Sequence, residues 1–217
     1  MVQKDIIWSY TGALILVNVL FFIIATNFGF SLDYSCSNSI CKNIALQPSA
    51  VLIGEGLWTF FTSMFMHAGI GHLFVNMISL MFIGGFVEKL IGHKRFLGLY
   101  FGAGLFAGIF FVLISALLNF DLNVYAVGAS GAIFGLGGLL AILTPRLPVL
   151  VFFIIPMPMW MAMIFLMAVL WALSAGLGLP IGNLAHLGGL LVGIIYGLYL
   201  KDKYPHKTQM ISRYFSR

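Results

Sequence analysis

Residues 10–28 read YTGALILVNVLFFIIATNF, an apolar run without a charged side chain. A membrane-spanning helix needs about 20 apolar residues in succession, whereas a membrane β-strand alternates apolar and polar residues over about 10 positions. The run does not alternate, and it is too long for the apolar part of a cleaved signal peptide. Because every backbone polar group in lipid needs an internal partner, we predict a retained spanning helix here.

The rest of the chain has the same character. Of its 217 residues, 61% are hydrophobic and 8% are charged, whereas soluble domains carry about 25% charged residues. The 25 glycines agree with a membrane protein, since small residues let membrane helices approach closely. We therefore predict an all-α polytopic membrane protein whose surroundings are the lipid bilayer.

Six apolar segments are candidate spans. They are residues 9–28, 70–90, 95–118, 129–144, 149–173 and 181–200. The only long connection, 29–69, is polar and aromatic, and a loop of that length is usually functional or structured. We predict a six-helix domain over residues 1–200, followed by a basic cytoplasmic tail over residues 201–217.

The basic residues provide a test of this span count. If the N-terminus is cytoplasmic, ten of the 11 lysines and arginines fall on the cytoplasmic side and only Lys42 falls outside. That distribution obeys the positive-inside rule, so we expect both termini in the cytoplasm. The net charge of +5 follows from this topology, and no nucleic acid partner is expected.

Cys36 and Cys41 both lie in the long outer connection, where disulfides can persist. A disulfide between them and two free thiols are both compatible with the sequence. Two cysteines do not make a structural zinc site, which takes four ligands. The stretch from His67 to His72 reads HAGIGH and lacks the glutamate of the zinc-protease motif, so no metal and no cofactor are expected.

Polar side chains gather at one predicted depth, in the outer half of the membrane. Such residues are costly in lipid and are therefore functional candidates. Ser130 opens the fourth predicted span, where a helix N-terminus stabilises developing negative charge. His186 lies near the start of the last span, beside a stripe formed by Gly189, Gly193 and Gly197.

The fourth span offers a similar face, formed by Ser130, Phe134, Gly137, Gly138 and Ala141. If the two faces meet, Ser130 and His186 come within reach, as a nucleophile and its base must. Glycine-flanked serines and buried histidines are also common in helix packing, so these residues alone leave a structural role open. His72 and Asn76 share one face of the second span, and both can donate hydrogen bonds to an oxyanion. No carboxylate is near His186 in the predicted topology, so we predict a Ser–His dyad.

Four motifs, in order, resemble the rhomboid family of intramembrane proteases. Residues 62–67 (TSMFMH) and 72–77 (HLFVNM) are similar to the family's long-loop exit and its His-x-x-x-Asn motif. Three further stretches are similar to its Gly-x-x-x-Glu, Gly-x-Ser-Gly and last-helix motifs: 84–89 (GGFVEK), 128–131 (GASG) and 185–189 (AHLGG). The resemblance covers residues 10–200 and implies a six-transmembrane-helix rhomboid-like bundle.

The resemblance also implies a serine endopeptidase that cleaves single-span membrane proteins near the extracytoplasmic face, in the plasma membrane. Ser130 would be the nucleophile and His186 the general base and acid. His72 and Asn76, with the backbone N–H of Ser130, would hold the oxyanion. Glu88 would be a structural anchor near the cytoplasmic end.

Two features depart from the family pattern, and neither removes a catalytic group. The long connection lacks a Trp-Arg pair, and Phe134 stands where some members have tyrosine. One alternative is an inactive rhomboid-like protein that binds membrane clients, although both Ser130 and His186 are present. The other is a small transporter, which would show inverted repeats and charges at the membrane midplane. Substrate and oligomeric state stay open.

Overall fold

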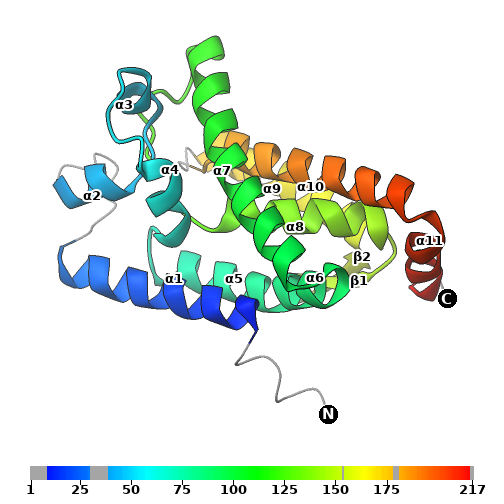
Figure 1. Cartoon of the computed structure of the whole chain (residues 1–217). Helices are drawn as coiled ribbons and strands as arrows, with labels where there is room; N and C mark the ends of the chain where they lie inside the picture. Colours follow the sequence, from blue (N-terminus) through cyan, green and yellow to red (C-terminus); the bar gives the residue numbers. More distant parts are fainter. Residues whose placement is uncertain (1–8, 30–38, 153, 178–180, 216–217) are drawn as a thin grey trace.

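The computed structural model describes residues 9–29, 39–152, 154–177 and 181–215. Figure 1 shows α10 running alongside α8, with α7 crossing both. The elements, in chain order, are α1 (Tyr10–Asn27), α2 (Ser39–Ile44), α3 (Pro48–Leu52), α4 (Thr59–Thr62), the 3₁₀ turn η1 (Ser63–Phe65), α5 (Ile70–Ser79), the π turn η2 (Leu80–Gly84), α6 (Gly85–Ile91), α7 (His93–Leu118), α8 (Ser130–Leu143), β1 (Pro148–Val151), β2 (Ile155–Pro158), α9 (Met159–Leu177), α10 (Asn183–Lys203) and α11 (Pro205–Tyr214).

Five helical segments among the described residues are long and apolar enough to cross a membrane. They are Tyr10–Asn27, Ile70–Ile91, His93–Leu118, Met159–Leu177 and Asn183–Lys203. The fourth predicted span is α8, which has only 14 residues and is buried along almost its whole length. The prediction of an all-α polytopic bundle is confirmed, and the helix count reaches six when the short central α8 is included.

The predicted start of the fifth span, at residue 149, is wrong. An antiparallel hairpin of β1 and β2, in which Pro148 lies opposite Pro158, occupies this stretch. Proline has no backbone N–H and fixes φ, so Pro148, Pro156 and Pro158 disfavour a helix here despite the apolar composition. The spanning helix α9 therefore begins only at Met159.

Among the described glycines, the closest helix contacts are those that join α8 to α10. A Cβ atom on Gly189 or Gly193 would overlap the backbone carbonyl of Gly131 or Gly135, respectively. The two helices therefore touch backbone to backbone, as small residues permit in membranes. The predicted meeting of the α10 stripe with the fourth span is observed.

The face that α8 presents differs in part from the predicted one. Gly138 belongs to it, because a Cβ atom there would meet the carbonyl oxygen of Leu190. Gly137, which was predicted on the same face, instead lies against Met163 of α9. Adjacent residues are about 100° apart around a helix, so Gly137 and Gly138 cannot both face α10.

Glu88, in α6, ties the second span to the beginning of α1. Its carboxylate accepts hydrogen bonds from the backbone N–H groups of Tyr10 and Thr11, each at 2.9 Å. It also accepts from the Thr11 hydroxyl at 2.6 Å, and His93 Nδ1 lies 2.5 Å away. The acid thus caps an otherwise unsatisfied helix N-terminus, which is the anchoring role that was expected of it.

The described part of the long connection, residues 39–69, is structured and packs on the loop that leads into α8. Leu46 and Ala126 exchange backbone hydrogen bonds at 3.0 and 2.8 Å, and the N–H of Gly128 donates to the carbonyl of Ser63 at 2.8 Å. Cys41 is buried and disulfide-bonded, while Cys36 lies outside the described residues.

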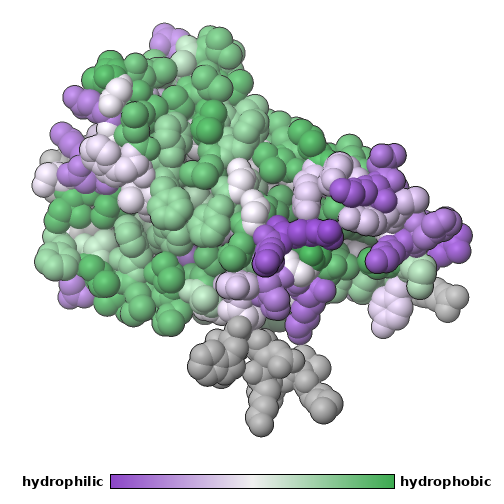
Figure 2. Space-filling model, in the orientation of Figure 1, coloured by the Kyte–Doolittle hydropathy of each residue, from purple (hydrophilic) through white to green (hydrophobic). Residues whose placement is uncertain are grey.

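The surface is that expected of a protein held in lipid. Figure 2 shows apolar residues covering the middle of this face, with hydrophilic residues gathered towards its two ends. Large side chains on the spans, such as Leu16, Phe74, Ile164 and Ile195, are more than half exposed. In water such a surface would be unfavourable, whereas in the bilayer it faces lipid.

Replacing Gly193 by alanine should destabilise the bundle, because the new methyl group has to push α8 and α10 apart. Overpacking of this kind costs about 1–3 kcal/mol. The matched control is Gly102→Ala in α7, where nothing lies within 4 Å of a built Cβ atom. Unfolding in mixed detergent micelles, followed by circular dichroism, should show a loss for Gly193→Ala only, and equal stabilities would refute the packing argument.

His67, between η1 and α5, should make the protein sensitive to acid. Its side chain is fully buried, and burial together with the nearby His72 lowers its pKa from 6.5 to about 3. Below pH 6.5 the unfolded chain binds a proton that the folded chain cannot. The equilibrium constant for folding therefore falls as the pH drops towards 3, by up to tenfold for each pH unit.

In the variant His67→Gln the unfolding free energy should therefore decline less steeply between pH 6.5 and 3. The slope against pH should correspond to one fewer proton taken up on unfolding. His206→Gln, at an exposed position in α11, controls for the loss of one histidine. An unchanged slope in His67→Gln would show that this imidazole does not govern the acid response.

Candidate active site

Ser130 is the first residue of α8, and the backbone before it is shaped by Gly128. That glycine has φ of 132°, a conformation that other residues rarely adopt. A Cβ atom there would also lie only 3.0 Å from the His72 ring and 3.4 Å from Ser130 Oγ. Glycine at this position therefore both permits the turn and lets His72 approach the serine.

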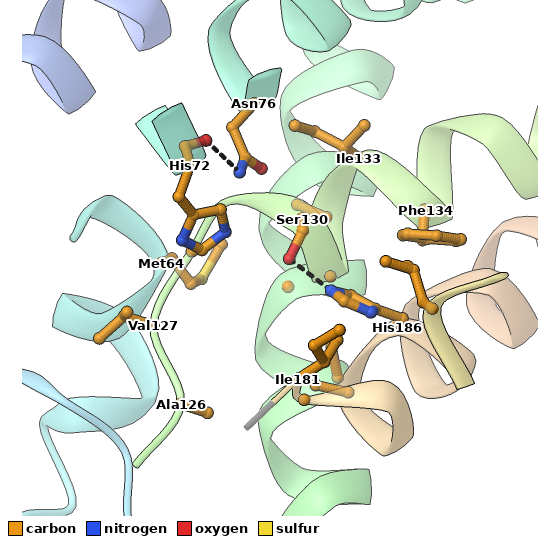
Figure 3. A pocket seen from close by; sticks show the side chains of 18 of the residues that line it. Met64, His72, Asn76, Ala126, Val127, Ser130, Ile133, Phe134, Ile181 and His186 are labelled. Carbon is orange, nitrogen blue, oxygen red and sulfur yellow. Dashed lines mark hydrogen bonds between the residues drawn. The ribbon is translucent and has the colours of Figure 1, made fainter. Parts of the chain in front are cut away.

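Ser130 and His186 are brought together by the packing of α8 on α10. Ser130 Oγ lies 2.7 Å from His186 Nε2, a hydrogen bond drawn in Figure 3. The Phe134 ring, one turn along α8, stacks on the imidazole with a centroid distance of 4.8 Å and an interplanar angle of 23°. This is the arrangement of a nucleophile and a base.

No carboxylate orients this histidine within the described part of the chain, where His186 Nδ1 is buried without a hydrogen-bond partner. The orientation of the ring instead comes from the stacked Phe134 and from the rigid α8–α10 contact. The tyrosine hydroxyl that some rhomboids have at position 134 is not needed for stacking, which uses only the ring face.

His72 and Asn76 project from α5 towards the same space, as Figure 3 shows. The backbone N–H of Ala68 donates to His72 Nδ1 at 3.3 Å. A neutral imidazole with an accepting Nδ1 carries its proton on Nε2, and this nitrogen is on the side of Gly128. The Asn76 amide donates one hydrogen bond to the carbonyl of His72 at 2.9 Å and has a second N–H to offer.

A cavity of about 390 Å³ contains all four predicted site residues on its lining. Its other walls are mainly apolar, and two spanning segments supply much of them. On the second span they include Val75, Ser79 and Ile83, and on α9 they include Met163, Leu166 and Leu170. The site is thus a small polar cluster at one wall of an apolar chamber.

A metal centre finds no support in the described ranges, where no three or more His, Cys, Asp or Glu side chains are grouped to hold an ion. His67, His72 and His186 come from three different segments, and only His72 and His186 line the cavity. His67 instead packs edge-on against the His72 ring at 5.1 Å, which makes it a support for that ring.

Sequence reasoning missed two groups of residues that shape the site. Ala68 positions His72 through its backbone N–H, and no sequence pattern could have indicated a main-chain contact of this kind. The α9 wall could have been found, because Met163, Leu166 and Leu170 recur at helical spacing. In a segment that is apolar throughout, this spacing does not stand out.

Comparison with known proteins places these observations in a family. The Rhomboid domain model matches residues 54–203. The chain is 34% identical over 151 residues to the mitochondrial Rhomboid protein 1 of Saccharomyces cerevisiae, covering 68% of this chain and 43% of that protein. It is 37% identical over 167 residues to RHOMBOID-like protein 1 of Arabidopsis thaliana, covering 76% and 40%, respectively.

A further relative carries a different description. Inactive RHOMBOID-like protein 8 of Arabidopsis thaliana is 32% identical over 113 residues, which cover 46% of this chain and 30% of that protein. The match to this chain spans less than half the length of each of these three relatives. The Rhomboid domain itself, however, is matched over more than two thirds of the 217 residues, and on that ground the chain belongs to the rhomboid family.

Proposed function

We propose that the protein is an intramembrane serine endopeptidase that works through a Ser130–His186 dyad. The observation that carries the proposal is the 2.7 Å contact between Ser130 Oγ and His186 Nε2. A serine hydroxyl is a weak nucleophile unless a base lies within hydrogen-bond reach. Such a pair, set at a helix N-terminus inside a cavity, is suited to acyl transfer.

The proposed reaction moves one proton back and forth through His186. Nε2 takes the proton of Ser130 as Oγ attacks the scissile carbonyl carbon, and then delivers it to the departing amine as the peptide C–N bond breaks. The acyl group stays on Oγ as an ester. A water molecule, deprotonated by the same nitrogen, attacks the ester and releases the carboxylic acid and the free serine.

The developing oxyanion would be held by three donors. They are the His72 Nε2–H, the free Asn76 N–H and the backbone N–H of Ser130, which begins α8 and has no acceptor within the helix. Two supports fix the side-chain donors: Ala68 binds the far nitrogen of His72, and the first amide proton of Asn76 is used on its own helix. Preorganised donors of this kind supply much of the rate enhancement in acyl transfer.

The proposed substrates are single-span membrane proteins, cut near the extracytoplasmic face. The apolar cavity walls from the second span and α9 suit the side chains of a membrane segment. Hydrolysis needs water, and the polar cluster at the beginning of α8 and α10 is the part of the site that water would reach. In the predicted topology this end faces the outside of the cell.

We also propose that the membrane is the plasma membrane, with both termini in the cytoplasm. The support is the distribution of the basic residues, ten of 11 on one side. Two relatives with "mitochondrial" in their names match this chain. The same charge rule applies to short loops in any membrane reached from the cytoplasm, and it therefore supports the orientation.

The alternative is a rhomboid-like protein that binds membrane clients without cleaving them. Its support is the relative described as inactive. Against it stands the intact pair of Ser130 and His186, held at hydrogen-bond distance.

Ser130→Ala and His186→Ala should each abolish cleavage of a single-span substrate in proteoliposomes, with a loss of about a thousandfold or more in kcat. The double variant should be no worse than either single one, because the two residues act as a unit. Ser49→Ala and His206→Gln, which lie away from the cavity lining, are the matched controls.

Cleavage that survives in Ser130→Ala would refute the mechanism. A serine-directed fluorophosphonate separates the two functions if the wild type cuts no substrate. Labelling of Ser130 that is lost in His186→Ala would mean that the dyad is active and that the substrates tested were not the right ones. The absence of both labelling and cleavage, in protein that is folded by circular dichroism, would favour client binding.

Loss of either side-chain donor should lower kcat by about a hundredfold with little change in KM, since these hydrogen bonds form fully only with the oxyanion. Asn76→Asp is the sharpest variant, because it keeps the shape of the side chain but replaces the donor by a negative charge. It should be at least as inactive as Asn76→Ala. Phe74→Ala, on the exposed side of α5, should leave kcat near wild type, and an active Asn76→Asp would exclude Asn76 from the oxyanion site.

A further inference from the structure

The last helix, α11, has an apolar face that the other described residues leave exposed. Lys207, Met210 and Tyr214 follow one another at i, i+3 and i+7 and therefore lie on one side of the helix. Met210 is 72% exposed and Tyr214 is 77% exposed, whereas Thr208, on the opposite side, is buried. The helix thus packs on the bundle through one face and presents a second, partly apolar face outwards.

This outward face borders a groove between α11 and α6. The groove has a volume of about 410 Å³ and is lined by Phe86, Lys89 and Leu90 of α6 and by Met210, Tyr214 and the neighbouring Phe215. Phe86 and Phe215 meet edge to face at 5.6 Å and form part of its wall. The groove is therefore apolar along its length, with one ammonium group from α6.

The position of the groove is that of a membrane surface. The α6 wall is the last part of the second span, which ends at Ile91. In Figure 1, α11 turns away from the end of α10 and lies across it instead of continuing it. A helix placed across the ends of the spans lies roughly in the plane of the lipid headgroups.

The charges around the groove are nearly all positive. The lysines and arginines of α6, of the first turn of α7, of the end of α10 and of α11 are all exposed. Among the described residues at this end, the only acids are Asp202 and Glu88, and Glu88 is buried in the cap of α1. An anion in the groove would meet a strongly favourable field.

An exposed apolar face with a cationic border at headgroup level has one favourable occupant. Exposure of the apolar area to water is unfavourable, and a neutral lipid would leave the positive charges without a counter-charge. We infer that the α6–α11 groove binds an anionic phospholipid, with an acyl chain along Phe86, Met210 and Tyr214 and the phosphate at Lys89. Lys207 lies outside the lining but one turn before Met210 on the same side of α11, and adds a second positive charge. A basic amphipathic helix in the interface is stabilised by both contributions.

The test is independent of proteolysis. The wild-type protein is placed in nanodiscs of phosphatidylcholine with phosphatidylglycerol, transferred to detergent, and its retained lipids are counted by native mass spectrometry. Phosphatidylglycerol should be retained several-fold over phosphatidylcholine. Lys89→Gln/Lys207→Gln should reduce its apparent affinity by about fivefold per lysine, while Lys94→Gln/Lys201→Gln removes the same charge outside the groove and should have a smaller effect.

Hydrogen exchange provides the second measurement and needs no variant. The amides of α11 (Pro205–Tyr214) should exchange more slowly in discs that contain phosphatidylglycerol than in phosphatidylcholine alone. Equal protection in both lipids, or equal lipid loss from the two lysine pairs, would overturn the assignment. Equal protection would mean that a neutral lipid or a protein partner covers the face. Equal lipid loss would mean that the overall positive charge, and not a defined site, attracts the anionic lipid.

Discussion

The close approach of α8 and α10 depends on two carbonyl oxygens, those of Gly131 and Gly135, occupying space that any side chain at Gly189 or Gly193 would need. In lipid there is no hydrophobic force between helices, so contact of this closeness is what holds them. It also fixes the register of one helix on the other. Ser130 precedes Gly131 by one residue and His186 precedes Gly189 by three, so the register that joins the glycines also joins the dyad.

The same reliance on backbone contacts recurs at the other polar groups. Glu88 is satisfied mainly by the N-terminus of α1, and the ring of His72 is held between the N–H of Ala68 and the bare backbone of Gly128. Main-chain partners bring no additional charge into the apolar layer, where an unpaired ion would be costly. A site built in this way can orient its imidazole by stacking and packing, which is consistent with the absence of a carboxylate partner for His186 in the described residues.

The features that were predicted from the sequence are those that depend on composition and on depth in the membrane. Continuous apolar runs gave α1, α7 and α10 within a few residues, and the shared depth of Ser130 and His186 pointed to the site. The hairpin before α9 was not predicted, because the segment is apolar enough for a spanning helix. Pro148, Pro156 and Pro158 nevertheless disfavour a helix there. The exact faces of α8 were beyond reach for a different reason: a helix that is buried on all sides has no polar side to fix its rotation.

The shortness of α8 bears on how the proposed hydrolysis would take place among membrane helices. At 1.5 Å per residue its 14 residues extend about 21 Å, whereas the apolar core of a bilayer is about 30 Å thick. If its C-terminal end lies at one surface, Ser130 lies inside the apolar layer, about 9 Å short of the opposite surface. The loop before it, with the positive φ of Gly128, fills that missing depth with irregular backbone. Such backbone is tolerated at this depth only where protein or a water-filled cavity surrounds it, and here it borders the cavity that contains Ser130, His186 and His72. A full-length α8 would have carried Ser130 out to the surface, so the short helix accounts both for the depth of Ser130 and for the irregular backbone beside the cavity.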